Sequence, residues 1–405
     1  MEKYKGAWKG EESNKIVDKK KLLFLLCLQG ALISFNVASI AGIIPAMSRA
    51  LGVPDFTMGN IIVAYMLPYG VAALLYGPLS RIVDTKKVTL CCLFIFSLSS
   101  FVSGIADSFY LLIFSRVVAG IAASAIIPLS LVLIGRLVPY EKRGKAVGTF
   151  FSVNFSSSVT GVFLSGLVGW KWMFLVPALG GWVVIGLIFF LFPSIEREQR
   201  GFKADYFSVL FKDKRCALFA YIFLATFIYR GIYSWLGVFF VHKFELSQWW
   251  ISLSLTGIGL GGVVGELVGG ALSDKKGRIG TATCGVFLLS ITTLGFVYTS
   301  SFLILGLLLL LHGLAWTINH SALTTILTDF PSHLRAEAIS LNSSLRFVSG
   351  GIGTAVSGFW IARGFDTPFL VYAFSFLLLA LMTRTMLGKS LPKKVVAGQN
   401  VFEEV

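Results

Sequence analysis

The stretch "PYEKRGKAVGTFFSVNFSSSVTG" (residues 139–161) decides the fold, because the chain contains a second copy of it. The counterpart is "PSHLRAEAISLNSSLRFVSGGIG" (331–353), which lies 192 positions further on. A shorter pair, "GPLSR" (77–81) and "GALSD" (270–274), has nearly the same displacement. Self-similarity at a fixed offset predicts two parallel halves built from one structural unit.

Most of the sequence around these copies is apolar. Of the 405 residues 56% are hydrophobic and only 14% are charged, with a mean hydropathy of +0.80. A transmembrane helix needs about 20 apolar residues, and twelve such runs can be placed. Because long apolar runs without alternating polarity cannot close into a barrel, we expect an all-α membrane protein. The twelve runs cover residues 22–47, 58–76, 88–106, 109–135, 146–168, 173–193, 216–241, 248–272, 279–299, 302–326, 338–361 and 367–388.

A charged segment, residues 194–215, separates the sixth run from the seventh. The sequence therefore predicts two pseudo-symmetric six-helix bundles joined by a linker, in which a substrate binds near mid-membrane between the bundles. The expected division is a cytoplasmic N-terminal tail, an N-terminal bundle, a cytoplasmic linker, a C-terminal bundle and a cytoplasmic tail, at residues 1–21, 22–193, 194–215, 216–388 and 389–405.

The net charge of +15 is explained by topology. If the N-terminus is cytoplasmic, the outer loops contain only Arg49, Lys171, Lys243 and Arg363, and most other basic residues fall on the inner side. This is the asymmetry of the positive-inside rule, so topology explains the charge and we expect no nucleic acid as a partner. The expected partners are membrane lipid and a small-molecule substrate, and the chain is expected to be monomeric. Short loops favour a prokaryotic inner membrane.

No pattern in the sequence indicates an enzyme. The five cysteines lie in or beside the spans without metal-ligand spacing, and no phosphate loop or nucleophile elbow is present. "GIGLGG" (257–262) matches a dinucleotide fingerprint only formally, because it lies inside an apolar span with no preceding strand. We expect no catalytic residues, no cofactor and no bound metal.

Motifs on the inner loops resemble the major facilitator superfamily over nearly the whole chain. In "GGALSDKKGR" (269–278) the family pattern is matched by Gly270, Asp274 and Arg278, with its second glycine one place late at Gly277. The first copy, "GPLSRIVDTKK" (77–87), keeps Gly77 but has Arg81 in place of the acidic residue, a position that Asp84 could fill. The resemblance implies that these residues gate the cytoplasmic side; Arg346 is a further gate candidate.

Two other stretches bear on the branch of the family. "RVVAG" (116–120) resembles the fourth-span motif of proton-coupled carriers, and "GWKWMF" (169–174) resembles the drug-efflux branch. By contrast, "SSSVTG" (156–161) retains only the last glycine of the antiporter motif. The resemblance thus implies a drug and proton antiporter, with one of its typical motifs missing.

Arg230, in "ATFIYRGIYSWLGVFF" (225–240), is the most prominent candidate substrate ligand. A charge at mid-bilayer costs roughly 2.5–3.5 kcal/mol on insertion scales, so it needs a partner or a water-filled cavity. Its guanidinium could bind a carboxylate or phosphate through two parallel hydrogen bonds. The alternative is a helix-bracing role in which Arg230 bonds carbonyl groups or Asn36. The predicted cavity set is Gln29, Asn36, Arg116, Asn154, Arg230, His312, Trp316 and Asn319.

Three residues are candidates for proton coupling. Glu266 is the carboxylate deep enough in a span to follow the alternating exposure of a cavity. Histidine as a residue type titrates near neutrality, so His312 or His320 could relay a proton. The alternative for Glu266 is packing beside Gly257, Gly261, Gly265 and Gly269, which make a smooth helix face, and each histidine could equally be an ordinary hydrogen-bonded one.

These features favour a secondary transporter that moves a small amphipathic organic solute by alternating access, with proton-coupled efflux. An organic-anion carrier that uses Arg230 is the alternative within transport. A membrane sensor that has lost transport is the alternative outside it.

Overall fold

The computed structural model describes residues 19–138, 140–191, 205–212, 215–328, 330 and 334–388. Within these ranges the chain is helical and contains no strand. The helices are α1 (Lys19–Leu51), α2 (Asp55–Met58), α3 (Asn60–Ile82), α4 (Thr85–Ile105), α5 (Phe109–Ala123), α6 (Ile126–Leu137), α7 (Tyr140–Leu164), α8 (Trp172–Leu191), α9 (Tyr206–Phe211), α10 (Cys216–Tyr233), α11 (Leu236–Phe244), α12 (Gln248–Lys276), α13 (Arg278–Tyr298), α14 (Phe302–Thr328), α15 (Arg335–Ile361) and α16 (Asp366–Gly388).

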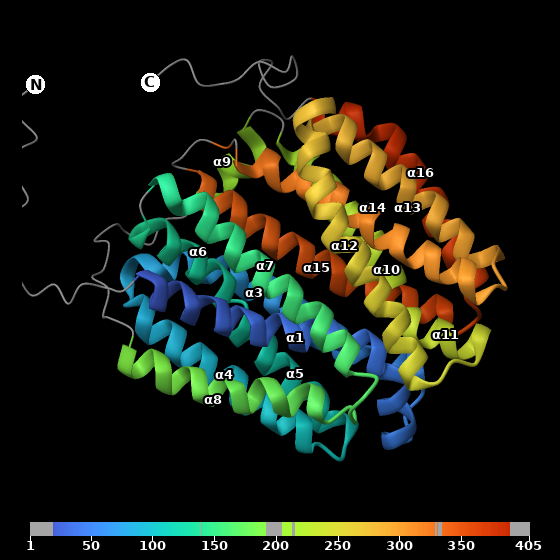
Figure 1. Ribbon diagram of the computed structural model, residues 1–405, viewed down its shortest axis with the longest axis horizontal. Coiled ribbons are helices and arrows are strands. Elements are labelled where there is room, and N and C mark those ends of the chain that lie inside the picture. Colours follow the sequence, from blue (N-terminus) through green and yellow to red (C-terminus); the bar gives the residue numbers. More distant parts are fainter. Residues whose placement is uncertain are drawn as a thin grey trace, which may run out of the picture.

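The helices form two bundles, one from α1–α8 and one from α10–α16 (Figure 1). Two of the predicted spans are interrupted: the run 109–135 is divided into α5 and α6 at Ser124, and the run 216–241 into α10 and α11 at Ser234. Such breaks are tolerated inside a membrane where neighbouring groups satisfy the freed backbone, and here Ser234 also bonds Thr354 Oγ1 of α15 at 2.8 Å.

By length and composition, eleven stretches of the described chain can cross a membrane. The predicted run 338–361 is not among them, although α15 is 27 residues long. Its polar residues, which include Glu337, Asn342 and Arg346, lower its mean hydropathy. α15 nevertheless packs between the bundles, against α3 and α10, where polar side chains need not face lipid.

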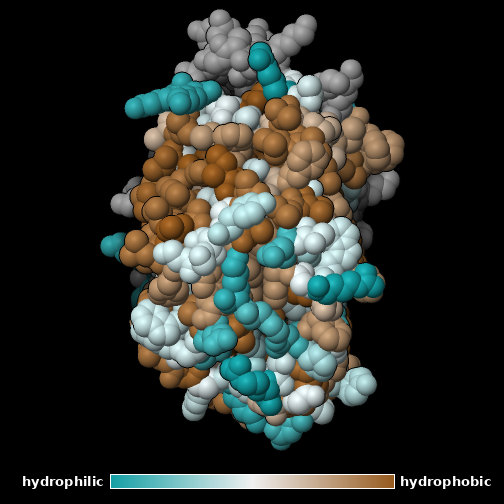
Figure 2. Space-filling model, turned by 90° about the vertical axis from the view of Figure 1, so that its right-hand side faces the viewer, coloured by the Kyte–Doolittle hydropathy of each residue, from teal (hydrophilic) through white to brown (hydrophobic). Residues whose placement is uncertain are grey.

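Large apolar side chains cover the outside of the protein. Phe190, Leu267 and Leu303 are 82%, 74% and 85% exposed, an arrangement that water would not stabilise. Figure 2 shows hydrophobic residues over much of the visible face. This surface identifies an integral membrane protein.

Helices α7 and α12 face each other across the two bundles, and their two ends differ in contacts. We call the end at which α1 begins the inner end, because the charge distribution predicts that it is cytoplasmic. At the outer end Ser165 bonds Ser252 across the bundles at 2.8 Å, and Gln248 Nε2 donates to the carbonyl of Gly42 at 2.9 Å. At the inner end, by contrast, no described atom lies within 4 Å of a Cβ built on Gly148 or Gly270. Helices α7 and α12 are therefore open at these two positions, while α3 and α15 pack against each other across the bundles.

The inner loops adopt the local structures that their motifs require. Asp84 caps α4, since its side chain accepts a hydrogen bond from the amide of Lys86 at 2.8 Å, so a carboxylate does stand at this helix N-terminus. Gly277, with φ of +77°, makes the turn from α12 to α13, at which Arg278 begins the next helix. The surroundings of Gly77 and the side chains of Arg81 and Asp274 lie outside the described part of the structure.

Candidate functional site

A cavity of about 220 Å³ lies between the two bundles. Helices α1, α3, α6 and α7 line it on one side, and α10, α12, α14 and α15 on the other. Glycines form part of its lining, namely Gly259, Gly262 and Gly313. Its walls are largely aromatic, through Tyr69, Phe155, Tyr229, Tyr233, Trp316 and Phe347.

Arg230 carries the only charge among the described residues that line this cavity. It lies in the last turn of α10, where a cation is favoured by the free carbonyl groups of a helix C-terminus. The helix break at Ser234 therefore provides part of the stabilisation that a charge at this depth requires. The guanidinium lies 5.5 Å from the ring centre of Tyr233, and it has no hydrogen-bond or ion-pair partner among the described residues.

A column of stacked rings connects Arg230 to a second arginine. Tyr229 stacks on Tyr233 with ring centres 5.7 Å apart, and on Trp316 with ring centres 3.8 Å apart and planes within 8°. The guanidinium of Arg346, on α15, lies 5.2 Å from the centre of the Trp316 ring. Both arginines are thus held by the faces of aromatic rings, which leaves their N–H groups able to bind a ligand.

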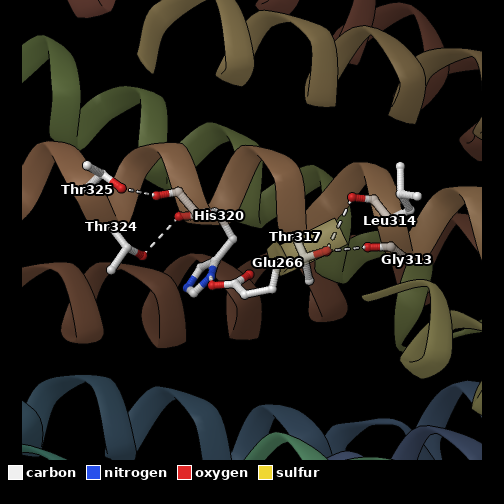
Figure 3. Close-up of polar contacts among 8 residues, drawn as sticks. Glu266, Gly313, Leu314, Thr317, His320, Thr324 and Thr325 are labelled. Atoms are coloured by element: carbon white, nitrogen blue, oxygen red, sulfur yellow. Dashed lines mark hydrogen bonds and ion pairs between the residues drawn. The ribbon is translucent and has the colours of Figure 1, made fainter. Parts of the chain in front are cut away.

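Glu266 and His320 form a pair. His320 Nδ1 of α14 lies 3.4 Å from Glu266 Oε1 of α12, and both side chains remain partly exposed. Figure 3 shows them pointing at each other from the two helices. Glu266 follows Leu255, Gly259 and Gly262 along one face of α12, and those three residues line the cavity. The pair therefore lies on the same helix face as the cavity, nearer the inner end.

The glycine face of α12 also has the packing role that its spacing predicts. Added Cβ atoms on Gly261 and Gly265 would lie 1.9 Å and 2.4 Å from backbone oxygens of α14, so these helices can approach only because the residues are glycine. Gly257, at the same spacing, meets no described atom within 4 Å. Glu266 adjoins this contact and reaches across it to His320.

Asn36 and Arg116 lie outside the cavity lining and bind each other. Arg116 is 1% exposed; its Nη1 donates to Asn36 Oδ1 at 2.7 Å, while Asn36 Nδ2 donates to the carbonyl of Met173 at 3.1 Å. The ring of Tyr65 covers the guanidinium at 4.2 Å. Since Asn36 is occupied by Arg116, it does not bond Arg230.

Four further residues predicted for the cavity are buried within single bundles or at helix contacts. Gln29 bonds Ser130 at 2.8 Å, and Asn319 Oδ1 accepts from Tyr221 at 2.9 Å. Asn154 packs against Gly30 of α1. His312 is fully buried, bonds Thr292 through Nδ1 at 2.8 Å and stacks on Tyr229, away from Glu266 and His320.

Sequence reasoning named Trp316 for the cavity but missed its other aromatic residues. Tyr229 and Tyr233 flank Arg230 at helical spacing, and this spacing was the available signal. No sequence signal pointed to Tyr69 and Phe347, because they are far apart in the chain. Their ring centres stack 3.6 Å apart across the two bundles.

The sequence profile of the Major Facilitator Superfamily matches residues 26–354. The chain therefore belongs to this superfamily of membrane transporters. Among its relatives is Multidrug resistance protein 2 of Bacillus subtilis (strain 168), which is 23% identical over 381 residues and is aligned over 89% of this chain and 94% of its own length.

Solved structures share the fold. A bacterial homologue of the human lysosomal transporter Spinster, in an inward-facing and unoccupied conformation, has a TM-score of 0.78 at 14% identity, covering 92% of this chain and 98% of its own. A human organic anion transporter has a TM-score of 0.67 at 18% identity, covering 90% and 99%. At these identities the likeness concerns the fold.

Proposed function

We propose that this chain is a secondary transporter that carries a small amphipathic organic solute by alternating access, with an anionic group of the solute bound at Arg230. The observation that carries this proposal is an arginine without a hydrogen-bond partner in a cavity whose other described lining residues are uncharged. A guanidinium in such a site gains about 1.5–3 kcal/mol from a hydrogen bond to an anion.

The remaining properties of the cavity agree with this proposal. Aromatic side chains suit the apolar part of an amphipathic compound, and a cavity near 220 Å³ is smaller than the roughly 300–1,000 Å³ of sites for drug-sized ligands. Relatives named for multidrug resistance and a fold neighbour named for organic anions are consistent with such a solute.

Glu266 and His320 are the proposed proton site. Their pairing at 3.4 Å and the partial exposure of both side chains support this proposal. On the predicted topology the structure is inward-open. We propose proton-coupled export by a monomeric chain in a prokaryotic inner membrane, the export direction being the one that the multidrug relative suggests.

Ligand-dependent thermal unfolding of the detergent-purified protein tests the Arg230 assignment, because a ligand that binds only the folded state raises the melting temperature. Benzenesulfonate should stabilise the wild type more than benzamide does, and Arg230→Gln should weaken its affinity by about tenfold or more. Equal stabilisation of both proteins by both compounds would assign Arg230 to helix bracing.

A further inference from the structure

Arg346, on α15, belongs to the same bundle as Arg230, on α10, and the two helices pack against each other. The Cγ atom of Arg230 is 2.9 Å from the point where a Cβ of Gly350 would stand, so the arginine side chain rests on α15 at this glycine. Arg346 precedes Gly350 by four residues, which places it on the same face of α15, about 6 Å away. The two arginines also interact electrostatically, as like charges.

Such a pair of cations is unfavourable without a counter-charge. Like charges repel, and the repulsion grows where little water screens it. The acidic residue that interacts with Arg346 is Glu266, whose carboxylate is already paired with His320 at 3.4 Å. No described residue hydrogen-bonds either guanidinium.

We propose that Arg230 and Arg346 together form a binding site for a doubly charged anionic group, such as a phosphate monoester or a pair of carboxylates on an aryl ring. This inference rests on the proposed function and makes it more specific. Each guanidinium presents a planar fork of donors that fits phosphate or carboxylate oxygens. Each guanidinium also lies over an aromatic ring, Arg230 over Tyr233 and Arg346 over Trp316, which limits the freedom that it loses when an anion binds.

Three ligands with the same phenyl ring provide the test, with dissociation constants measured on the full chain in detergent at constant ionic strength. Phenyl phosphate carries nearly two charges at pH 7.5, benzenesulfonate carries one and benzamide none. We expect phenyl phosphate to bind the wild type about tenfold more tightly than benzenesulfonate, the gain expected from one further charged hydrogen bond. Arg346→Gln should make the two anions equal, and Arg230→Gln should weaken both. Arg363→Gln, on the exposed outer end, should change neither affinity.

A second comparison needs no substitution and so does not depend on a variant's folding. Below pH 6 phenyl phosphate loses its second charge, while benzenesulfonate keeps its single one. The ratio of their affinities for the wild type should therefore fall towards one between pH 7.5 and pH 5. The ionisable groups that face the arginines are Tyr229 and Tyr233 on α10, Glu266 on α12 and, through Glu266, His320 on α14. Because benzenesulfonate keeps its charge, any change in its affinity with pH measures the effect of these protein groups alone.

The outcomes separate this inference from the proposed function. If the wild type binds both anions equally while Arg230→Gln weakens both, the double-charge inference is wrong and the Arg230 site stands. If benzamide binds as tightly as the anions and Arg230→Gln changes nothing, both fail.

Discussion

Arg116 and Arg230 illustrate two ways in which this chain accommodates an arginine within the membrane. Arg116 is fully buried, binds Asn36 at 2.7 Å and lies under Tyr65, so its hydrogen bond joins α5 to α1 and its ring contact joins α5 to α3. Arg230 stands at a helix terminus beside a cavity and has no such bond among the described residues. The first arrangement is typical of structure and the second of binding.

We predict opposite effects of removing the two charges. Arg116→Gln should lower the free energy of unfolding by about 1–3 kcal/mol, since it leaves Asn36 buried with an acceptor lacking its partner. Arg230→Gln should leave stability unchanged or raise it, because an uncompensated cation is removed. Thermal unfolding in the same detergent, without ligand, measures both; a larger loss in Arg230→Gln would mean that Arg230 braces the helices.

At the residue scale the sequence singles out Arg230 as a candidate ligand, but it does not predict which side chains surround it. An arginine in an apolar run signals function or bracing whatever its partners, and Trp316 likewise reaches the cavity as predicted. Helical spacing predicted that His312, Trp316 and Asn319 share one face of a helix. In the structure, however, Asn319 bonds Tyr221 and His312 bonds Thr292. Periodicity shows which residues share a helix face, whereas the neighbour that each side chain meets depends on how distant helices cross.

At the scale of elements, α12 combines packing and chemistry. Gly261 and Gly265 bring α14 within contact, and this approach allows Glu266 to reach His320. The spacing of the glycines predicted the close contact, but the partner helix could not be read from it. The twelve apolar runs likewise predict the helices well, while the breaks at Ser124 and Ser234 occur inside runs that read as continuous.

Glu266→Gln tests the proposed proton site. Glutamine keeps the shape and can still hydrogen-bond His320, but it cannot take up a proton at neutral pH. We expect accumulation driven by a pH gradient to be lost in proteoliposomes, while exchange of labelled for unlabelled solute continues. Arg363→Gln, at the exposed outer end, serves as a control. Accumulation that persists in Glu266→Gln would show that the proton is carried elsewhere.

The whole molecule is a pair of bundles that are joined by hydrogen bonds at the outer end and by the packing of α3 against α15. Hydrogen bonds from Gln248 and Ser252 close the outer end, while Gly148 and Gly270 stand apart from other described atoms at the inner end. The internal repeat predicts two bundles because each half must fold alike. It does not predict which end is closed, since a repeat allows both arrangements with similar energy.

Cysteine accessibility tests this arrangement. In a background in which the five native cysteines are replaced by alanine, Gly148→Cys and Gly270→Cys should react readily with a membrane-impermeant maleimide in detergent. Ser252→Cys, a nearly isosteric change at a buried contact, should react slowly. Fast reaction at residue 252 together with protection at residues 148 and 270 would indicate that the outward-open state predominates.

Flux through proteoliposomes tests most directly whether Arg230 acts in transport. Radiolabelled benzenesulfonate is suitable, because a permanent charge keeps it from crossing lipid unaided. The wild type should move it faster than protein-free vesicles, Arg363→Gln should match the wild type, and Arg230→Gln should lose most of the flux. Equal flux in wild type and Arg230→Gln would contradict the anion site, and binding without flux in the wild type would make the protein a sensor of this fold.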